Sequence, residues 1–173
     1  GLLAQHLVEN VVEAPGKVFF CNSGAEANES LIKFARKYGQ MVPQAGGDPR
    51  TEIITFEGCF HGRTMAGISA TANPAVKKGF APLLEGFQHL PWNDVEELKR
   101  SLTPNTVAIL LEPVQGESGI NAASADFLRA IHEICRERQI LLMFDEVQCG
   151  LGRLGTPMGC LLYTSDAADE WLR

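Results

Sequence analysis

The segment Ile140-Leu141-Leu142-Met143-Phe144-Asp145-Glu146-Val147-Gln148 decides the fold of this chain, because an uninterrupted apolar run ends directly in acidic residues. Such a run is typical of a strand that is buried on both faces, as in parallel sheets. Asp145 would then lie at the carboxyl end of the strand, where open α/β sheets bind their ligands. Since a carboxylate is costly there without a cationic partner, the segment predicts a positively charged ligand group opposite Asp145.

Strands and helices alternate along the rest of the chain. Apolar runs predict strands at three further places, and helical spacing, caps or small-residue stretches predict five helices. The strands are Lys17–Cys21, Thr51–Phe56 and Thr106–Leu111, and the helices span 2–12, 25–38 and 64–71, begin at an Asn93 cap, and run from a Ser124 cap to Gln139. We therefore expect an α/β fold with a mostly parallel sheet and helices on both faces.

Composition narrows the possible functions. The 173 residues suit one domain, and the net charge of −6 argues against a nucleic-acid or anionic-membrane surface. No apolar run approaches the roughly 18 residues of a membrane helix, and the N-terminus lacks the basic region of a signal peptide. The five cysteines are scattered and the histidines share no metal-ligand spacing. These features predict a cytoplasmic protein with reduced thiols and no metal.

Ser23, Gly24 and Ala25 stand between a predicted strand and a predicted helix. Free backbone N–H groups at a helix N-terminus bind phosphate, and glycine lets the backbone approach closely. By themselves these residues are more simply explained as a plain helix cap. The turn at Gly24 lacks the GxGxxG spacing of a dinucleotide fingerprint, and a Walker B role for Asp145-Glu146 would need a P-loop that the chain lacks.

Two further segments carry candidate site residues. In Phe60-His61-Gly62-Arg63 the aromatic ring suits the face of a flat ligand and the guanidinium suits a carboxylate, although a core Phe and a solvated Arg would look the same. Glu112 and Glu117 follow the Thr106–Leu111 run. They are either a pair of acid–base groups or ordinary loop charges.

Together these motifs resemble the class III (ω-amino acid) aminotransferases, which use pyridoxal 5′-phosphate. The resemblance covers residues 1–156 and implies part of the cofactor-binding large domain of a fold-type I transferase. It implies that Asp145 keeps the pyridine nitrogen protonated and the ring electron-accepting. The implied cofactor-binding residues are Ser23, Gly24, Ala25, Phe60, Asp145, Val147 and Gln148. Many members have Thr where this chain has Ala25, so one hydroxyl contact would be lost.

The resemblance also implies a substrate. Arg63 matches a residue that binds the α-carboxylate of an N-acylated ornithine, and Glu117 matches one that faces the substrate pocket. His61 favours the branch that moves the δ-amino group of N-acetylornithine to 2-oxoglutarate in arginine biosynthesis, because ornithine-specific members usually have Trp there. Enzymes acting on succinylornithine, ornithine or another ω-amino substrate remain alternatives. The family implies a homodimer for the full-length parent.

The catalytic lysine of the family lies a few tens of residues after the motif that matches Asp145–Gln148, and no lysine follows Gln148 here. Because the chain also begins with Gly1 rather than Met, we expect a fragment that is inactive by itself. Cys160–Glu170 resembles a translated sequencing adapter, so we interpret residues 157–173 as a non-native tail; a natural C-terminal helix is the alternative. The non-enzymatic hypothesis is an inert truncated product.

Overall fold

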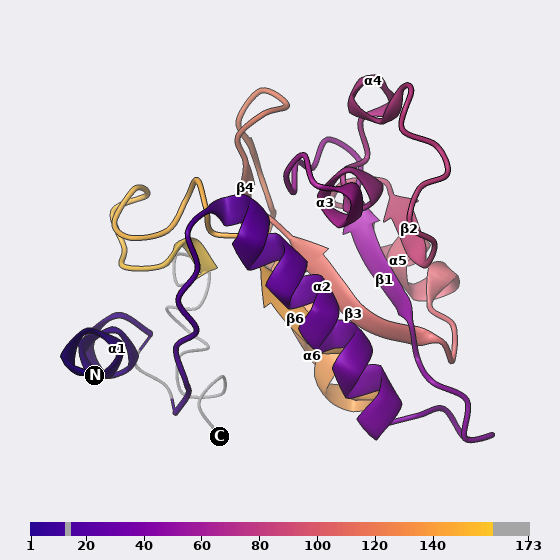
Figure 1. The fold of residues 1–173 in the computed structure, drawn as a ribbon, viewed down its shortest axis with the longest axis horizontal. Coiled ribbons are helices and arrows are strands. Elements are labelled where there is room, and N and C mark those ends of the chain that lie inside the picture. Colours follow the sequence, from indigo (N-terminus) through magenta and orange to yellow (C-terminus); the bar gives the residue numbers. More distant parts are fainter. Residues whose placement is uncertain (13–14, 161–173) are drawn as a thin grey trace.

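The computed structural model describes residues 1–12 and 15–160. Its centre is a parallel sheet of four strands in the order β2-β1-β3-β6 (Figure 1). These strands are β1 (Glu52–Phe56), β2 (Phe87–Leu90), β3 (Thr106–Leu111) and β6 (Leu141–Phe144). A two-stranded antiparallel ribbon of β4 (Val114–Gln115) and β5 (Asn121–Ala122) follows β3. The expected parallel α/β sheet is confirmed.

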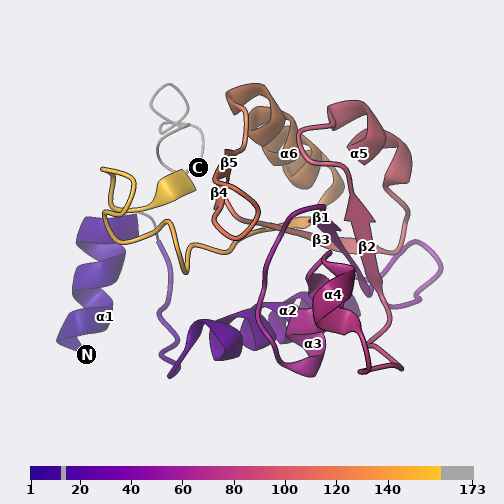
Figure 2. The same cartoon turned by 90° about the horizontal axis from the view of Figure 1, so that it is seen from above.

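Helices cover both faces of this sheet, as Figure 2 shows from above. One face carries α2 (Gly24–Met41) and α3 (Met65–Ala70), and the other carries α5 (Val95–Ser101) and α6 (Ala125–Arg138). The short α4 (Pro74–Lys77) follows α3. At the N-terminus α1 (Leu2–Leu7) continues into the π-helical η1 (Val8–Val12), and α1 has no buried residue.

The side-chain alternation of the strands divides the core into two layers. Ile54 and Ile109 pack with α5 and α6, whereas the adjacent Ile53 and Ala108 pack with α2 and α3. Every residue of β3 is buried, as its unbroken apolar sequence predicts. β3 is a central strand that pairs with β1 on one side and with β6 on the other.

The caps of two helices test the sequence predictions directly. Ser124 caps α6, as expected, because its side chain accepts a hydrogen bond from Phe127 N. The Asn93 prediction was wrong by one residue, since Asp94 caps α5. Asn93 instead adopts a left-handed backbone (φ 61°), and its Oδ1 accepts a hydrogen bond from Ser124 N. The asparagine thus joins the starts of two helices rather than beginning one.

The predicted strand Lys17–Cys21 was wrong. This segment forms no ladder with the described residues, and Phe19 and Phe20 are 65% and 58% exposed. Phe19 packs edge-on against Phe34 of α2 at 5.9 Å between ring centroids. An apolar run measures the tendency to be buried, whereas a strand also needs a neighbouring strand to take its backbone hydrogen bonds.

The chain after β6 turns back on itself through residues 146–160. Glu146 accepts hydrogen bonds from the N–H groups of Gly159 and Cys160, at 2.5 and 2.7 Å. Of the tail predicted for 157–173, residues 161–173 lie outside the described part. The interpretation of that tail as non-native remains a prediction.

Candidate active site

The carboxyl ends of three parallel strands place side chains at one edge of the sheet. Asp145 follows β6, Glu112 follows β3, and Phe60 lies in the loop after β1. Together with the start of α2 they enclose a cavity of about 320 Å³. The lining residues are Gly24, Ala25, Asn28, Phe60, Gly62, Arg63, Glu112, Asp145, Val147 and Gln148. Eight predicted or discussed site residues are therefore assembled, whereas Ser23 and Glu117 lie outside this lining.

Asp145 is the best-anchored group of the cavity, with only 5% of its surface exposed. Its Oδ2 accepts hydrogen bonds from Asn28 Nδ2 and His61 Nδ1, both at 2.8 Å, and its Oδ1 accepts one from Val147 N at 3.1 Å. Burial alone would raise the pKa of this carboxyl, but the hydrogen bond and charge of His61, with the other two donors, hold it below its usual value. Asp145 is therefore a fixed anion at the cavity wall.

His61 contacts Asp145 and is fully buried. Burial favours the neutral imidazole, yet the hydrogen bond to Asp145 and the nearby Cys59 raise the pKa of His61 to about 10. Two buried and oppositely charged groups thus face each other at 2.8 Å. The geometry makes His61 the partner of Asp145.

Asn28 was missed by the sequence analysis. It lies one helical turn after Gly24, so it projects from the same face of α2. That spacing was the available signal. Its Oδ1 is buried and has no hydrogen-bond partner among the described residues, which leaves an acceptor at the cavity wall.

The start of α2 is built to present backbone N–H groups. Ser23 Oγ accepts from Glu26 N at 3.2 Å, and the Glu26 carboxylate accepts from the backbone N–H and the side chain of Asn22. Gly24 and Ala25 lie in the first turn of α2, where backbone N–H groups have no acceptor within the helix. Both residues line the cavity, so an anion there would meet these groups and the positive end of the helix dipole.

Gly24 also sets how closely α2 approaches the end of β6. A Cβ at this position would lie 2.8 Å from Cγ1 and 2.9 Å from Cγ2 of Val147. Such distances are too short for real carbon atoms, so the contact requires glycine. Val147 itself remains 59% exposed and offers an apolar surface to the cavity.

Phe60 and Arg63 form one wall. The guanidinium carbon of Arg63 lies 5.7 Å from the centre of the Phe60 ring, a cation–π contact. Phe60 N donates to Glu112 Oε2 at 3.1 Å, and burial raises the pKa of Glu112. Glu112 is buried and therefore holds the loop after β1 in place through the backbone of Phe60.

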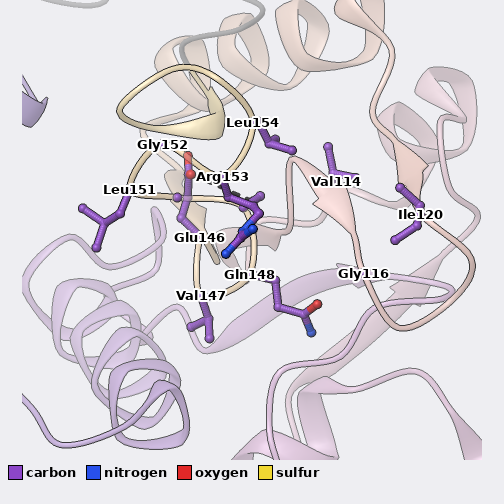
Figure 3. Close-up of a pocket in the computed structure, with 12 residues that line it drawn as sticks. Val114, Gly116, Ile120, Glu146, Val147, Gln148, Leu151, Gly152, Arg153 and Leu154 are labelled. Carbon is purple, nitrogen blue, oxygen red and sulfur yellow. Dashed lines mark hydrogen bonds between the residues drawn. The ribbon is translucent and has the colours of Figure 1, made fainter.

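Gln148 and Glu117 contact each other, since Gln148 Nε2 donates to Glu117 Oε1 at 3.0 Å. A larger hollow of about 850 Å³ opens beside Gln148, between the β4–β5 ribbon and the 146–154 loop. Figure 3 shows Val114 and Ile120 on the ribbon side and Val147 and Gln148 below the loop. This hollow contains neither Asp145 nor the start of α2. We therefore place the candidate site in the smaller cavity.

The cavity residues fit pyridoxal phosphate by their chemistry. A buried carboxylate suits a pyridinium nitrogen, free helix N–H groups suit a phosphate, and Phe60 with Val147 suits the faces of a flat ring. No lysine is among the residues that line the cavity. Within residues 1–12 and 15–160, no group of three or more His, Cys, Asp or Glu side chains could hold a metal, and no helix is long and apolar enough to cross a membrane.

Comparison with known proteins shows the family of this chain. The family model Aminotransferase class-III matches residues 1–169. The chain belongs to the class III aminotransferases, which confirms the resemblance and the pyridoxal phosphate dependence of the family. Among curated relatives, the acetylornithine aminotransferase of Methanocaldococcus jannaschii is 50% identical over 152 residues, covering 86% of this chain and 37% of that protein. The one from Prochlorococcus marinus is 48% identical over 163 residues, covering 91% and 38%.

Solved structures give the same fold. The ornithine aminotransferase of Toxoplasma gondii matches with a TM-score of 0.83 and 32% identity, covering 92% of this chain and 37% of that one. A Bacillus anthracis aminotransferase matches with a TM-score of 0.85 and 31% identity, covering 94% and 40%. The chain thus spans about two fifths of the length of the proteins it matches.

Proposed function

We propose that this chain is the cofactor-binding part of an acetylornithine aminotransferase. The whole enzyme would move the δ-amino group of N-acetylornithine to 2-oxoglutarate, a step of arginine biosynthesis, as a cytoplasmic homodimer. The observation that carries the proposal is the Asp145 carboxylate, fixed as an anion by His61 and Asn28 in a cavity that also holds the start of α2. The names of the relatives support the substrate.

Each cavity residue has a role in this proposal. Pyridoxal phosphate supplies an electron-accepting ring that makes the C–H bond next to the reacting nitrogen acidic. Asp145 holds the proton on the pyridine nitrogen, and the His61–Asn28 pair keeps that carboxylate in place. Gly24 and Ala25 N–H groups hold the phosphate with Ser23 beside them, and Phe60 and Val147 pack on the ring faces.

Three residues serve the ring oxygen and the substrate. Gln148 donates to the phenolate oxygen, and its bond to Glu117 fixes its amide in one orientation. Arg63 binds the α-carboxylate of the substrate bidentately. Glu117 lies beside that position and orders the substrate pocket.

The proton transfer of a transaminase needs a lysine beside the cofactor, and none lines the cavity. We therefore propose that the 173-residue chain binds the cofactor but does not turn over. An inert product that binds nothing is the second hypothesis, favoured by the exposed Phe19 and Phe20. A cofactor-binding measurement separates the two.

The probe is pyridoxamine 5′-phosphate, because it keeps the phosphate and the pyridine nitrogen but forms no imine with surface lysines. The purified chain should bind it with a saturable change in cofactor fluorescence. Asp145→Asn should weaken that binding about tenfold or more, the size of a lost charge-assisted hydrogen bond. Asp126→Asn is the matched control, since Asp126 lies on α6 and pairs with Arg129 at the surface.

Activity is tested separately in a full-length protein. Residues 1–156 would replace the matching segment of the Methanocaldococcus jannaschii relative, and transamination of N-acetylornithine would be measured. The proposal predicts activity in the hybrid and none in the 173-residue chain. A folded hybrid that binds cofactor but uses no ornithine derivative would refute the substrate, and a chain that shows no saturable binding would favour the inert product.

A further inference from the structure

A second cavity adjoins the cofactor cavity. It measures about 480 Å³ and lies between the loop after β1, the segment 72–76 and the turn between β4 and β5. Phe60 and Arg63 line both cavities, so the aromatic ring and the guanidinium form the partition between them. A ligand whose carboxylate binds Arg63 would therefore have room on the side away from the cofactor.

The lining of this second cavity is partly apolar. Its apolar lining residues are Ala72, Pro74, Val76, Cys59 and Phe60. A short hydrocarbon group gains free energy by leaving water against such a surface. An unacylated ammonium group would lose its hydration against this apolar surface, and the nearby carboxylates would compensate only part of that cost.

Asn73 supplies a directed polar contact in the same lining. Its Oδ1 is already occupied, because it accepts a hydrogen bond from Ala75 N at 2.9 Å and caps α4. Its amide NH2, which can only donate, has no hydrogen-bond partner among the described residues. Asn73 is exposed, so a carbonyl oxygen in the cavity would take the place of water at this NH2 group.

The charges of the lining exclude one class of ligand. Glu57 and Glu117 carry carboxylates, and Arg63 is the only cation among the lining residues. If Arg63 holds the α-carboxylate of the substrate, no cation remains for a second carboxylate. A second anionic group would then meet Glu57 without compensation.

We propose, on the basis of the function proposed above, that this cavity binds the group on the α-nitrogen of the substrate and restricts it to an uncharged acyl group. Asn73 donates to the acyl carbonyl oxygen, and the 72–76 side packs against the acyl carbon chain. Glu57 disfavours an acyl group that ends in a carboxylate, such as succinyl. The cavity thereby distinguishes the two acylated ornithines.

The test uses the full-length hybrid that carries residues 1–156, with kcat/KM measured for N-acetylornithine, N-succinylornithine and ornithine. The acetyl compound should be the best of the three. Glu57→Gln should raise the succinyl-to-acetyl ratio of kcat/KM about three- to fivefold, the size that a partly exposed charge contributes. Glu57→Lys should raise that ratio further. Glu96→Gln, an exposed carboxylate on α5, is the matched control and should leave the ratio unchanged.

Asn73→Asp tests the acyl contact separately. It keeps an oxygen to cap α4 but removes the donor, so KM for N-acetylornithine should rise about tenfold with little change in kcat. KM for ornithine, which has no acyl oxygen, should not rise. A parallel rise for both amino donors would contradict the acyl contact.

The outcomes separate this inference from the proposed function. If N-acetylornithine is transaminated and the ratio stays constant in both Glu57 variants, the selectivity claim is overturned and the proposed function stands. If the unaltered hybrid prefers the succinyl compound, the same claim is overturned. If none of the three amino donors reacts in a cofactor-loaded hybrid, the proposed function fails and the inference with it.

Discussion

His61 is fully buried and His89 is partly buried, and their pKa values are shifted in opposite directions. Burial by itself lowers the pKa of both imidazoles. His61 faces the Asp145 carboxylate and has its pKa raised to about 10. His89 lies between Thr55 Oγ1 at 2.6 Å and Lys77 Nζ at 2.7 Å, and burial together with the charges of Lys77 and His61 lowers its pKa to about 4. At His61 the partners outweigh burial, whereas at His89 burial and the neighbouring charges lower the pKa together.

The two histidines therefore have different roles. At the cavity, His61 and Asp145 form an ion pair, which fixes the carboxylate where a cationic ring nitrogen is proposed to bind. On β2, the neutral His89 joins α4 to the sheet through its contacts with Lys77 and Thr55. Substitutions that exchange or remove the partners test whether the comparison holds.

The largest effect should come from removing the partner of His61. Asp145→Asn leaves a buried imidazolium without its counter-charge, so the pKa of His61 should fall well below 10, because only Cys59 then opposes the effect of burial. The free energy of unfolding should drop by about 3 kcal/mol, as when one member of a buried ion pair is lost. Urea denaturation gives the stability and an NMR titration gives the pKa. A His61 that still titrates near 10 in the variant would show that Asp145 is not the cause.

A smaller effect should appear in the pH dependence of stability. The raised pKa of His61 stabilises the fold below pH 6.5, and this contribution is lost as the pH rises towards 10. The lowered pKa of His89 stabilises it above pH 6.5, and this contribution is lost as the pH falls towards 4. Stability should therefore be greatest near pH 6.5 and decline by at least about 1 kcal/mol on each side.

His89→Gln provides the control for that profile. It should flatten the acid side between pH 6.5 and 4 and leave the alkaline side unchanged, because the His61 pair remains. Denaturation midpoints measured across the pH range check both. An equal loss of both slopes would mean that the two histidines titrate as one unit.

The smallest effect should come from the ammonium beside His89. Lys77→Met removes a neighbouring positive charge, so the pKa of His89 should rise from about 4 towards 6.5. The stability at neutral pH should change by only about 0.5 kcal/mol, because Lys77 is partly exposed. Lys78→Met, at the exposed neighbouring position, should leave the pKa of His89 where it is. The same NMR titration measures both variants.

The sequence predicted best those parts of the fold that local pattern determines. The Thr106–Leu111 run became β3 with the same bounds, since a strand buried on both faces is apolar throughout. β2 was not predicted, because Gln88 and His89 interrupt its apolar pattern and only Leu90 is buried. Lys17–Cys21 has the composition of a strand without a partner in the described chain. The apolar composition of a segment indicates that it is buried, whereas its pairing with another strand depends on residues far away in the sequence.

The candidate site also has parts that the sequence predicted and parts that it did not. Asp145 and the Gly24 turn were visible because each follows or precedes a regular element. The bonds from His61 and Asn28 to Asp145 join residues 84 and 117 positions apart, which no local spacing encodes. The link between Gln148 and Glu117 likewise depends on how the β4–β5 ribbon folds over the end of β6. The family resemblance indicates the roles of these residues, whereas their hydrogen-bond partners are known only from the folded structure.

The contact between Gly24 and Val147 has a consequence for how this site can change over time. The helix start and the strand end touch so closely that a side chain at position 24 collides with the valine. A larger residue at 24 becomes tolerable only after the residue at 147 has become smaller. The order of substitutions therefore matters, and an evolving or engineered variant has one permitted route through this pair of positions rather than two.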